Sequence, residues 1–333
     1  MRRSLSMGFC LGGVAVATAT VLAIGTIKEL TLDEGRDDVN RVTAPVVDGM
    51  NTPIAVGTVA STFDRGAKIV RKGATGFMTR GPEYNLDKAI DLGALFASAL
   101  KAESTAMGFG SATGGWQIDG TIKDVYLESK QIPYGATLFW GYMDIDFRVA
   151  SGGAPPQTVS MRLHNYNGGY NAGMGRKDEA AVALAHLLVE GAQEALARLN
   201  RLHFKAPPHP GVAALIAQVR GSGERRSASA VHRLGLSGSP DAVPVLLDLI
   251  PKEPDENRRS SLIEALARLG SADAVGLLAQ RYATEDEDCR WVTLKAMDYV
   301  GGPDAEQVLK GPGVGDKDGG PRRLAEKVTG GKK

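Results

Sequence analysis

Hydrophobic and polar residues alternate with a period of two along much of the first half of the chain. Ile145, Phe147 and Val149 fall on one face of such a stretch, and Asp144 and Asp146 fall on the other. Alternation of this kind is typical of β-strands with one buried face. It predicts strands over residues 54–60, 116–127, 137–149 and 158–164.

Two further stretches carry apolar residues at helical spacing. Residues 86–100 and 177–199 place Leu, Ala and Ile at intervals of three and four, so each predicts an amphipathic helix. Asn85 or Asp87 is the expected N-cap of the first. An antiparallel sheet covered on one face by two helices satisfies this order of elements. We therefore predict an α+β domain over residues 50–204.

The second half of the chain repeats itself at a regular interval. The positions that recur are Arg226, Arg258, Arg290 and Arg322, together with Gly238, Gly270 and Gly302. Each unit contains two short apolar segments at helical spacing. One helix pair cannot bury its apolar face alone, so such units stack on one another. The pattern predicts an all-α solenoid over residues 208–330.

Two strings carry a family resemblance in this half. They are residues 229–247 (SAVHRLGLSGSPDAVPVLL) and residues 261–278 (SLIEALARLGSADAVGLL). They resemble HEAT repeats of the short type found in phycobilisome lyases. The resemblance implies a protein-binding scaffold. Pigment lyase activity belongs to a few members of that group, and no residue here supports a chromophore.

The first half resembles a second group, on its element order and on residues 116–125 (WQIDGTIKDV). It is similar to small bacterial envelope lipoproteins of the YajG and LPS-assembly-accessory kind. That resemblance implies an envelope protein without catalytic residues. Those lipoproteins carry a small residue before the lipidated Cys, whereas Phe9 precedes Cys10 here. Lipid anchoring is therefore not expected.

The start of the chain is basic and then apolar. Arg2 and Arg3 precede an apolar stretch that ends near Ile27, as in secretory leaders. Residues 1–27 are therefore a cleaved signal peptide, with cleavage expected after Ala19, or an uncleaved N-terminal anchor. Residues 28–49 are charged and unpatterned, which predicts a linker. This leader places the protein in the periplasm or cell envelope.

Composition narrows the possible partners. The chain has 333 residues, with 39 Lys and Arg against 38 Asp and Glu, a net charge of +1. A nucleic-acid binder usually carries a clear basic excess, so nucleic acid is not an expected partner. Two cysteines, Cys10 and Cys289, cannot form a disulfide framework. We expect one or more protein partners on the solenoid and an association with the envelope or membrane.

The repeated arginines suggest where a protein would bind. Arg226, Arg258 and Arg290 would lie in register along the solenoid, where they either contact an acidic partner or form ion pairs between repeats. Ion pairing is the favoured interpretation. Trp291 is a second candidate, because Trp is enriched at binding hot spots. Filling a gap between repeats explains it equally well.

A glycine-rich loop before the second predicted helix is a candidate anion site. Gly173 and Gly175 would offer backbone N–H groups, and Arg176 and Lys177 would add charge. The Ser or Thr that follows Lys in a phosphate-binding P-loop is missing, because Asp178 stands there. A simple strand-to-helix connection is the favoured interpretation.

Enzymatic chemistry has little support in the sequence. Asp144 and Asp146 share a strand face but have no patterned His or Cys beside them. No zinc-binding spacing of His and no serine-hydrolase elbow occurs. We expect no catalytic residue, metal or cofactor, and predict an exported scaffold that is not an enzyme. The alternatives are a lipid or small-ligand site around Phe139, Trp140 and Tyr142 on an open sheet face, and an enzyme that combines both aspartates with the glycine-rich loop.

Overall fold

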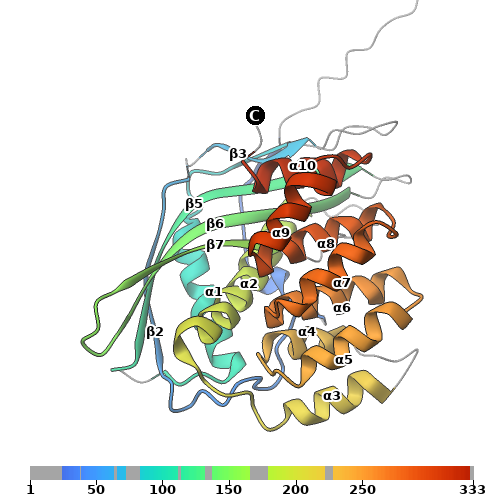
Figure 1. Ribbon diagram of the computed structural model, residues 1–333. Coiled ribbons are helices and arrows are strands. Elements are labelled where there is room, and N and C mark those ends of the chain that lie inside the picture. The colour runs from blue at the N-terminus through green and yellow to red at the C-terminus, as the bar shows by residue number, and fades with distance from the viewer. Residues whose placement is uncertain are drawn as a thin grey trace, which may run out of the picture.

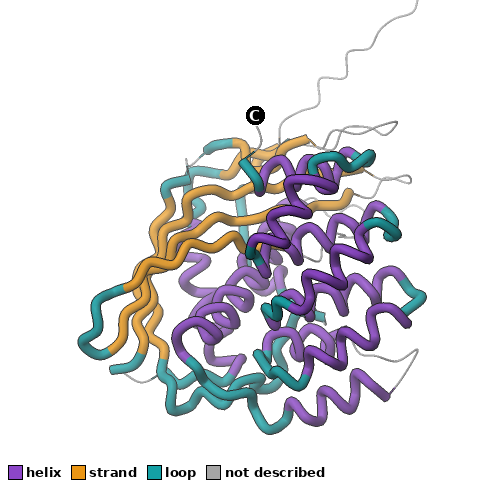
Figure 2. Tube along the Cα trace, in the orientation of Figure 1, coloured by secondary structure: helices purple, strands orange, loops and turns teal. Residues whose placement is uncertain are grey.

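The computed structural model describes residues 25–330, apart from 38, 64–65, 73–82, 112–113, 132–136, 166–178 and 222–227. Strands gather on one side of the molecule and helices on the other (Figures 1 and 2). The fold class is confirmed, since an α+β part precedes an all-α part. The predicted signal peptide lies mostly outside the described residues.

One mixed sheet holds the strands of the first half. They are β1 (Gly25–Ile27), β2 (Ile54–Ser61), β3 (Lys68–Lys72), β4 (Tyr84–Leu86), β5 (Trp116–Gln131), β6 (Thr137–Ser151) and β7 (Gln157–Asn165). The order is β1-β4-β3-β5-β6-β7, and β2 pairs with β5 beside β3. The meander β5-β6-β7 is antiparallel as predicted. The prediction of a wholly antiparallel sheet is wrong, because β2 and β3 both run parallel to β5.

Two helices cover one face of the sheet, α1 (Leu92–Met107) and α2 (Glu179–Leu199), and a π-turn (Asn200–Phe204) extends α2. Alternate residues of β6, from Phe139 to Val149, pack beneath them in the core. Helix α1 begins later than predicted. Residues 84–86 form β4 instead, and the carboxylate of Asp91 caps the helix by accepting the Ala94 N–H at 3.0 Å.

The prediction of a linker over residues 28–49 is wrong. It packs against the helices, with a 3₁₀ turn (Leu32–Gly35) lying on α2. A Cβ on Gly35 would stand 2.4 Å from the backbone of Ala185, so only glycine allows this approach. Asn40 is fully buried, and Arg36 pairs with Glu103 at 2.9 Å. Arg36 and Asp37, two of the charged residues that suggested a solvated linker, thus have partners in the fold.

The second half stacks helices in two layers. They are α3 (Val212–Gly221), α4 (Ala228–Leu236), α5 (Ala242–Leu249), α6 (Glu256–Leu269), α7 (Asp273–Tyr282), α8 (Glu287–Val300), α9 (Pro303–Val308) and α10 (Gly319–Val328). Short 3₁₀ and π turns, Ile250–Lys252 and Leu309–Gly313, extend α5 and α9. Helices α4, α6, α8 and α10 lie side by side in the first layer. Gly270 ends α6 in the left-handed conformation, at φ +65°, as its recurrence predicted.

The two halves pack directly on each other. Helices α4 and α6 contact α2, and α8 contacts β7, so the first helical layer faces the α+β part (Figure 1). Among the described residues, one helix, Glu179–Phe204, is long and apolar enough to cross a membrane. The apolar 18-residue window of that stretch is fully buried between the sheet and the repeats, and this central position accounts for its apolar character.

Candidate functional site

An arginine ladder joins consecutive repeats. Asp255 and Asp286 stand at the N-caps of α6 and α8, where each carboxylate accepts a backbone N–H at 2.9 Å. Four residues after each cap comes an arginine, Arg259 or Arg290. Each guanidinium donates through Nη1 to a carbonyl of its own preceding loop, at 2.9 Å to Glu253 and 2.6 Å to Glu285.

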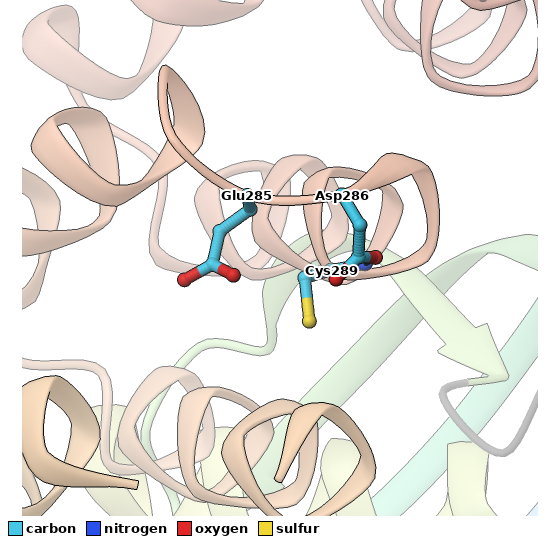
Figure 3. A group of neighbouring side chains, drawn as sticks. All are labelled: Glu285, Asp286 and Cys289. Atoms are coloured by element: carbon cyan, nitrogen blue, oxygen red, sulfur yellow. Dashed lines mark hydrogen bonds between the residues drawn. The ribbon is translucent and has the colours of Figure 1, made fainter. Parts of the chain in front are cut away.

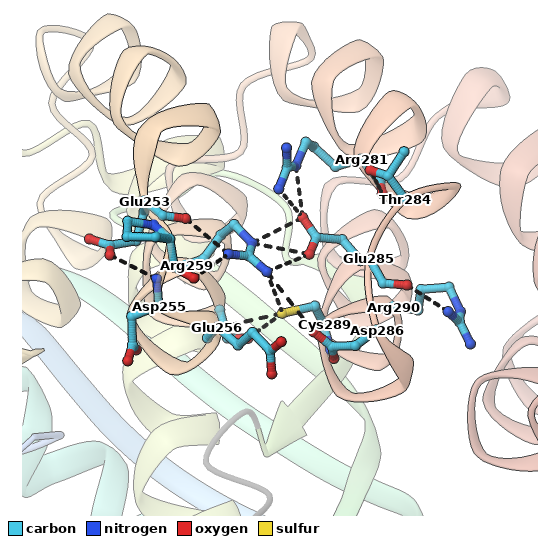
Figure 4. Close-up of polar contacts among 12 residues, drawn as sticks. Glu253, Asp255, Glu256, Arg259, Arg281, Thr284, Glu285, Asp286, Cys289 and Arg290 are labelled. Atoms are coloured by element: carbon cyan, nitrogen blue, oxygen red, sulfur yellow. Dashed lines mark hydrogen bonds and ion pairs between the residues drawn. The ribbon is translucent and has the colours of Figure 1, made fainter.

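The other side of each guanidinium reaches the loop of the next repeat. Arg259 donates to Glu285 through Nε at 3.0 Å and Nη2 at 2.7 Å. Arg290 donates through Nε to Asp316 at 3.0 Å, and it also pairs with Asp318. Figure 4 shows the first of these junctions. Of the arginines singled out from sequence, Arg290 forms the ion pairs between repeats that were the favoured interpretation.

The 32-residue spacing of the arginines predicted Arg258 as a member of the ladder, but the member is Arg259. The interval between the N-caps Asp255 and Asp286 is one position shorter than that between Arg258 and Arg290, so Arg259 is the equivalent of Arg290. Arg258 is instead partly exposed and pairs with Glu253 at 3.2 Å. The adjacent Arg258 and Arg259 hid this offset in the sequence. Arg226 lies outside the described residues.

Three possible metal-binding groups meet beside the ladder (Figure 3). One ligand atom each of Glu285, Asp286 and Cys289 lies within 4.8 Å of the others. Two guanidiniums already occupy Glu285, because Arg281 donates to it at 2.7 Å in addition to Arg259. Burial raises the pKa of the Cys289 thiol to about 11, which disfavours the thiolate that binds metals. These three side chains therefore suit ion pairs with arginines better than the binding of a metal ion.

Trp291 does not lie at the surface. It is 7% exposed and packs against Trp140 of β6, with ring centroids 4.8 Å apart. Lys295 lies over its ring at 4.2 Å. Trp291 thus fills a gap, as its alternative interpretation held, but the gap lies between a repeat and the sheet.

The expected open sheet face is covered at the same place. Phe139, Trp140 and Tyr142 are each at most 6% exposed. Phe139 lies in the core beneath α1 and α2, and Tyr142 stacks on Tyr126. The gap left between β5, β6, α8 and α10 has a volume of about 10 Å³, enough for one water molecule. Within the described part of the chain, these three residues therefore do not line an open sheet face.

The remaining residues singled out from sequence either form ion pairs or lie outside the described part of the chain. Asp144 pairs with Arg162 at 2.8 Å, and Asp146 pairs with Lys123 at 2.8 Å. The hydrogen bonds from Lys123 and Ser160 lower the pKa of Asp146. The candidate anion loop with Gly173, Gly175, Arg176 and Lys177 lies outside the described residues.

A buried charge cluster at the junction of the two halves was missed from sequence. Helix α2 contributes Glu190 and Glu194, both fully buried. Arg268 of α6 lies between them, with its Nε 3.4 Å from Glu194 and its Nη2 3.9 Å from Glu190. Glu264 and Lys295 complete the cluster from α6 and α8. The signal in the sequence was two acids four residues apart on a helix rich in Ala and Leu.

This cluster also covers the edge strand of the sheet. The backbone N–H of His164 in β7 donates to Glu194 at 3.1 Å, and the ammonium of Lys295 donates to the carbonyl of Asn165. The His164 ring contacts Asp298 of α8 at 2.6 Å, and Arg162 pairs with the same carboxylate at 3.3 Å. Side chains from α2 and α8 thus take the place of a neighbouring strand.

The cluster contains three carboxyl groups, of Glu190, Glu194 and Glu264, but only two side chains that carry a full positive charge, Arg268 and Lys295. Their pKa values are shifted as a result. Burial raises the pKa of Glu194 to about 8 and that of Glu264 to about 7. Burial works against the charge of Glu190 too, but His186 and Arg268 outweigh it and lower its pKa to about 2. Burial lowers the pKa of Lys295 to about 8. The junction is therefore best balanced when Glu194 carries its proton.

Comparison with known proteins supports the second half of this description. The chain matches the model for HEAT repeats over residues 212–298, which confirms the HEAT resemblance. A search of curated proteins finds no match.

Two solved structures resemble part of the chain. Protein XCC0632 from Xanthomonas campestris, of the family DUF330, is 13% identical, covers 47% of this chain and 88% of its own, and gives a TM-score of 0.29. A crystal structure of an uncharacterized protein is 13% identical, covers 47% and 95%, and gives 0.26. Likenesses at this level carry no argument, so the envelope resemblance stays a prediction.

The ladder predicts different effects for two adjacent arginines. Arg259→Ala should lower the free energy of unfolding by about 3 kcal/mol, because it leaves Glu285 buried with one of its two guanidiniums missing. Arg258→Ala removes a partly exposed pair and should cost less than about 1 kcal/mol. Urea unfolding of both variants measures the difference. Equal losses would contradict the assignment of Arg259 to the ladder.

The charge cluster predicts a pH dependence. The pKa of Glu194 is raised in the folded state, so its contribution to stability is full below pH 4.5 and is lost as pH rises toward 8. Glu194→Gln should remove this loss. The free energy of unfolding of the variant should therefore rise relative to that of the native protein, by up to about 1.4 kcal/mol per pH unit between pH 4.5 and 8.

Urea unfolding at several pH values between 5 and 8 checks this expectation. Glu306→Gln, at an exposed position on α9, is the matched control and should leave the pH profile unchanged. A Glu194→Gln profile parallel to that of the native protein would show that Glu194 keeps an ordinary pKa.

Proposed function

We propose that this chain is an exported scaffold without catalytic activity, which binds a protein through the exposed helices of its HEAT repeats. HEAT repeats generally mediate protein interactions, and stacked repeats offer extended binding surfaces. The observation that carries the proposal is the difference between the two helical layers. One layer is used inside the molecule, and the other is left for a partner.

The first layer is not available to another protein. Helices α4 and α6 lie against α2, α8 lies against β7, and Arg323 of α10 pairs with Glu128 of β5. Helices α5 and α7 pack on the other side of α6 and α8 (Figure 1). Pro244 and Asp248 of α5 and Gln280 of α7 are exposed there. A partner would therefore meet the second layer.

The leader supports export. Cleavage after Ala19 would leave the first strand intact, because β1 begins at Gly25 and pairs with β4. The absence of catalysis is supported by the pairing of the candidate acids. Asp144 and Asp146 are both held in ion pairs, and Glu285 is held by two arginines.

Photo-crosslinking in the native host tests the binding surface. A photoreactive residue at Asp248 or Gln280 should give a crosslink to a protein partner, because both positions are exposed on the second layer. Gln157 and Thr158, exposed on β7, are the matched control positions and should give none. Crosslinks from the β7 positions alone would move the binding surface to the sheet.

Fractionation tests export separately. The full-length gene expressed in a Gram-negative host should yield a protein in the periplasm or envelope, and N-terminal sequencing should find a start near Thr20. A cytosolic protein that retains Met1 would remove the export part of the proposal and leave the binding part untouched.

A further inference from the structure

The arginine ladder has a third member, at the end of the described solenoid. Asp318 stands at the N-cap of α10, and Arg322 follows four residues later, as Arg290 follows Asp286. The Nη1 of Arg322 donates to the carbonyl of Asp316 at 3.2 Å. This is the same contact with the preceding loop that Arg259 and Arg290 make. All three guanidiniums therefore share one hydrogen bond to the preceding loop.

Arg322 differs from the other two at Nε and Nη2, the atoms on the outer side of the guanidinium, which faces away from its own preceding loop. Arg259 and Arg290 use Nε and Nη2 to hold carboxylates of the next loop. In the part of the chain that the structure describes, no repeat follows α10, and Arg322 forms no ion pair. Its side chain is exposed, and so is that of the nearby Lys317.

We propose that the end of the solenoid formed by α10 and its preceding loop binds an acidic segment of a partner protein, whose carboxylate takes the outer side of Arg322. The inference rests on the proposed function in one respect, that the repeats have a protein partner. It adds the chemistry of that partner and a second surface, separate from α5 and α7.

The two inner junctions indicate why a carboxylate fits. A guanidinium presents its donors in a fixed fork that matches two oxygens, and Glu285 takes both Nε and Nη2 of Arg259 in this way. An exposed arginine normally loses side-chain freedom when it pairs. The bond from Arg322 to the Asp316 carbonyl already restrains the guanidinium, so less freedom is lost on binding.

A peptide-binding measurement on the full chain tests the inference. The probe is a fluorescein-labelled peptide with the sequence of residues 282–288 (YATEDED), the loop that supplies Glu285 to Arg259. Fluorescence anisotropy at low ionic strength should show binding to the native protein. Arg322→Ala should weaken it by about fivefold or more, the effect of losing one well-placed ion pair.

Two controls separate this site from general attraction. Arg220→Ala removes an exposed arginine of α3, at the other end of the solenoid, and should leave affinity within about twofold of the native value. A peptide with Gln and Asn in place of Glu and Asp should not bind. Urea unfolding of Arg322→Ala should match the native protein, since the side chain is exposed.

Two results would overturn the inference. One is a native protein that binds the acidic peptide no better than the amide peptide. The other is equal weakening by Arg322→Ala and Arg220→Ala, which would reduce the effect to net charge. Neither result bears on crosslinks from Asp248 or Gln280, because those positions lie on a different surface. Failure here and failure of the proposed function are therefore distinguishable.

Discussion

The structure depends on the burial of two acids in α2. Glu190 and Glu194 lie at the centre of the molecule, where an uncompensated carboxylate is unfavourable by several kcal/mol. The cations that compensate them, Arg268 and Lys295, belong to the repeats. The α+β part has an apolar core of its own, but the buried acids of its central helix depend on cations of the repeats. The sheet, α2 and the repeats form one unit in which each part satisfies charges of another.

The same arrangement solves the problem of an exposed sheet edge. An edge strand offers unpaired backbone groups, and it tends to pair with other chains unless something covers it. The C-terminal end of β7 is covered by charged side chains, with Glu194 accepting from His164 and Lys295 donating to Asn165. Hydrogen bonds from ionisable groups replace those of a strand, and they hold α8 beside the sheet at the same time.

Local patterns in the sequence predict the elements well. The alternation in β6 predicted the inward residues Ile145, Phe147 and Val149, and the recurring glycines predicted the end of α6 at Gly270. These features depend on neighbours along the chain. The parallel pairing of β2 and β3 with β5 was not predictable in this way, because it brings together strands with α1 between them in the chain.

The candidate site was harder to predict, because its members come from distant segments. The ladder was visible as a repeat in the sequence. However, the repeat that begins at Asp255 is one position shorter than the next, so Arg258 rather than Arg259 seemed equivalent to Arg290. Trp291 suggested a surface anchor since nothing local places Trp140 against it. Likewise, Asn40 lies in a charged stretch, yet it reaches Glu190 across 150 positions.

In a solenoid each unit contacts only its neighbours, so the array itself does not fix the number of units. Here α8 is fastened to β7 through His164 and Asp298, and α6 is fastened to α2 through Arg268. An extra unit inserted before α8 would carry Lys295 and Asp298 one unit away from the strand they cover. The number of units between α4 and α8 is therefore fixed by the sheet, while growth of the array remains open only beyond α10.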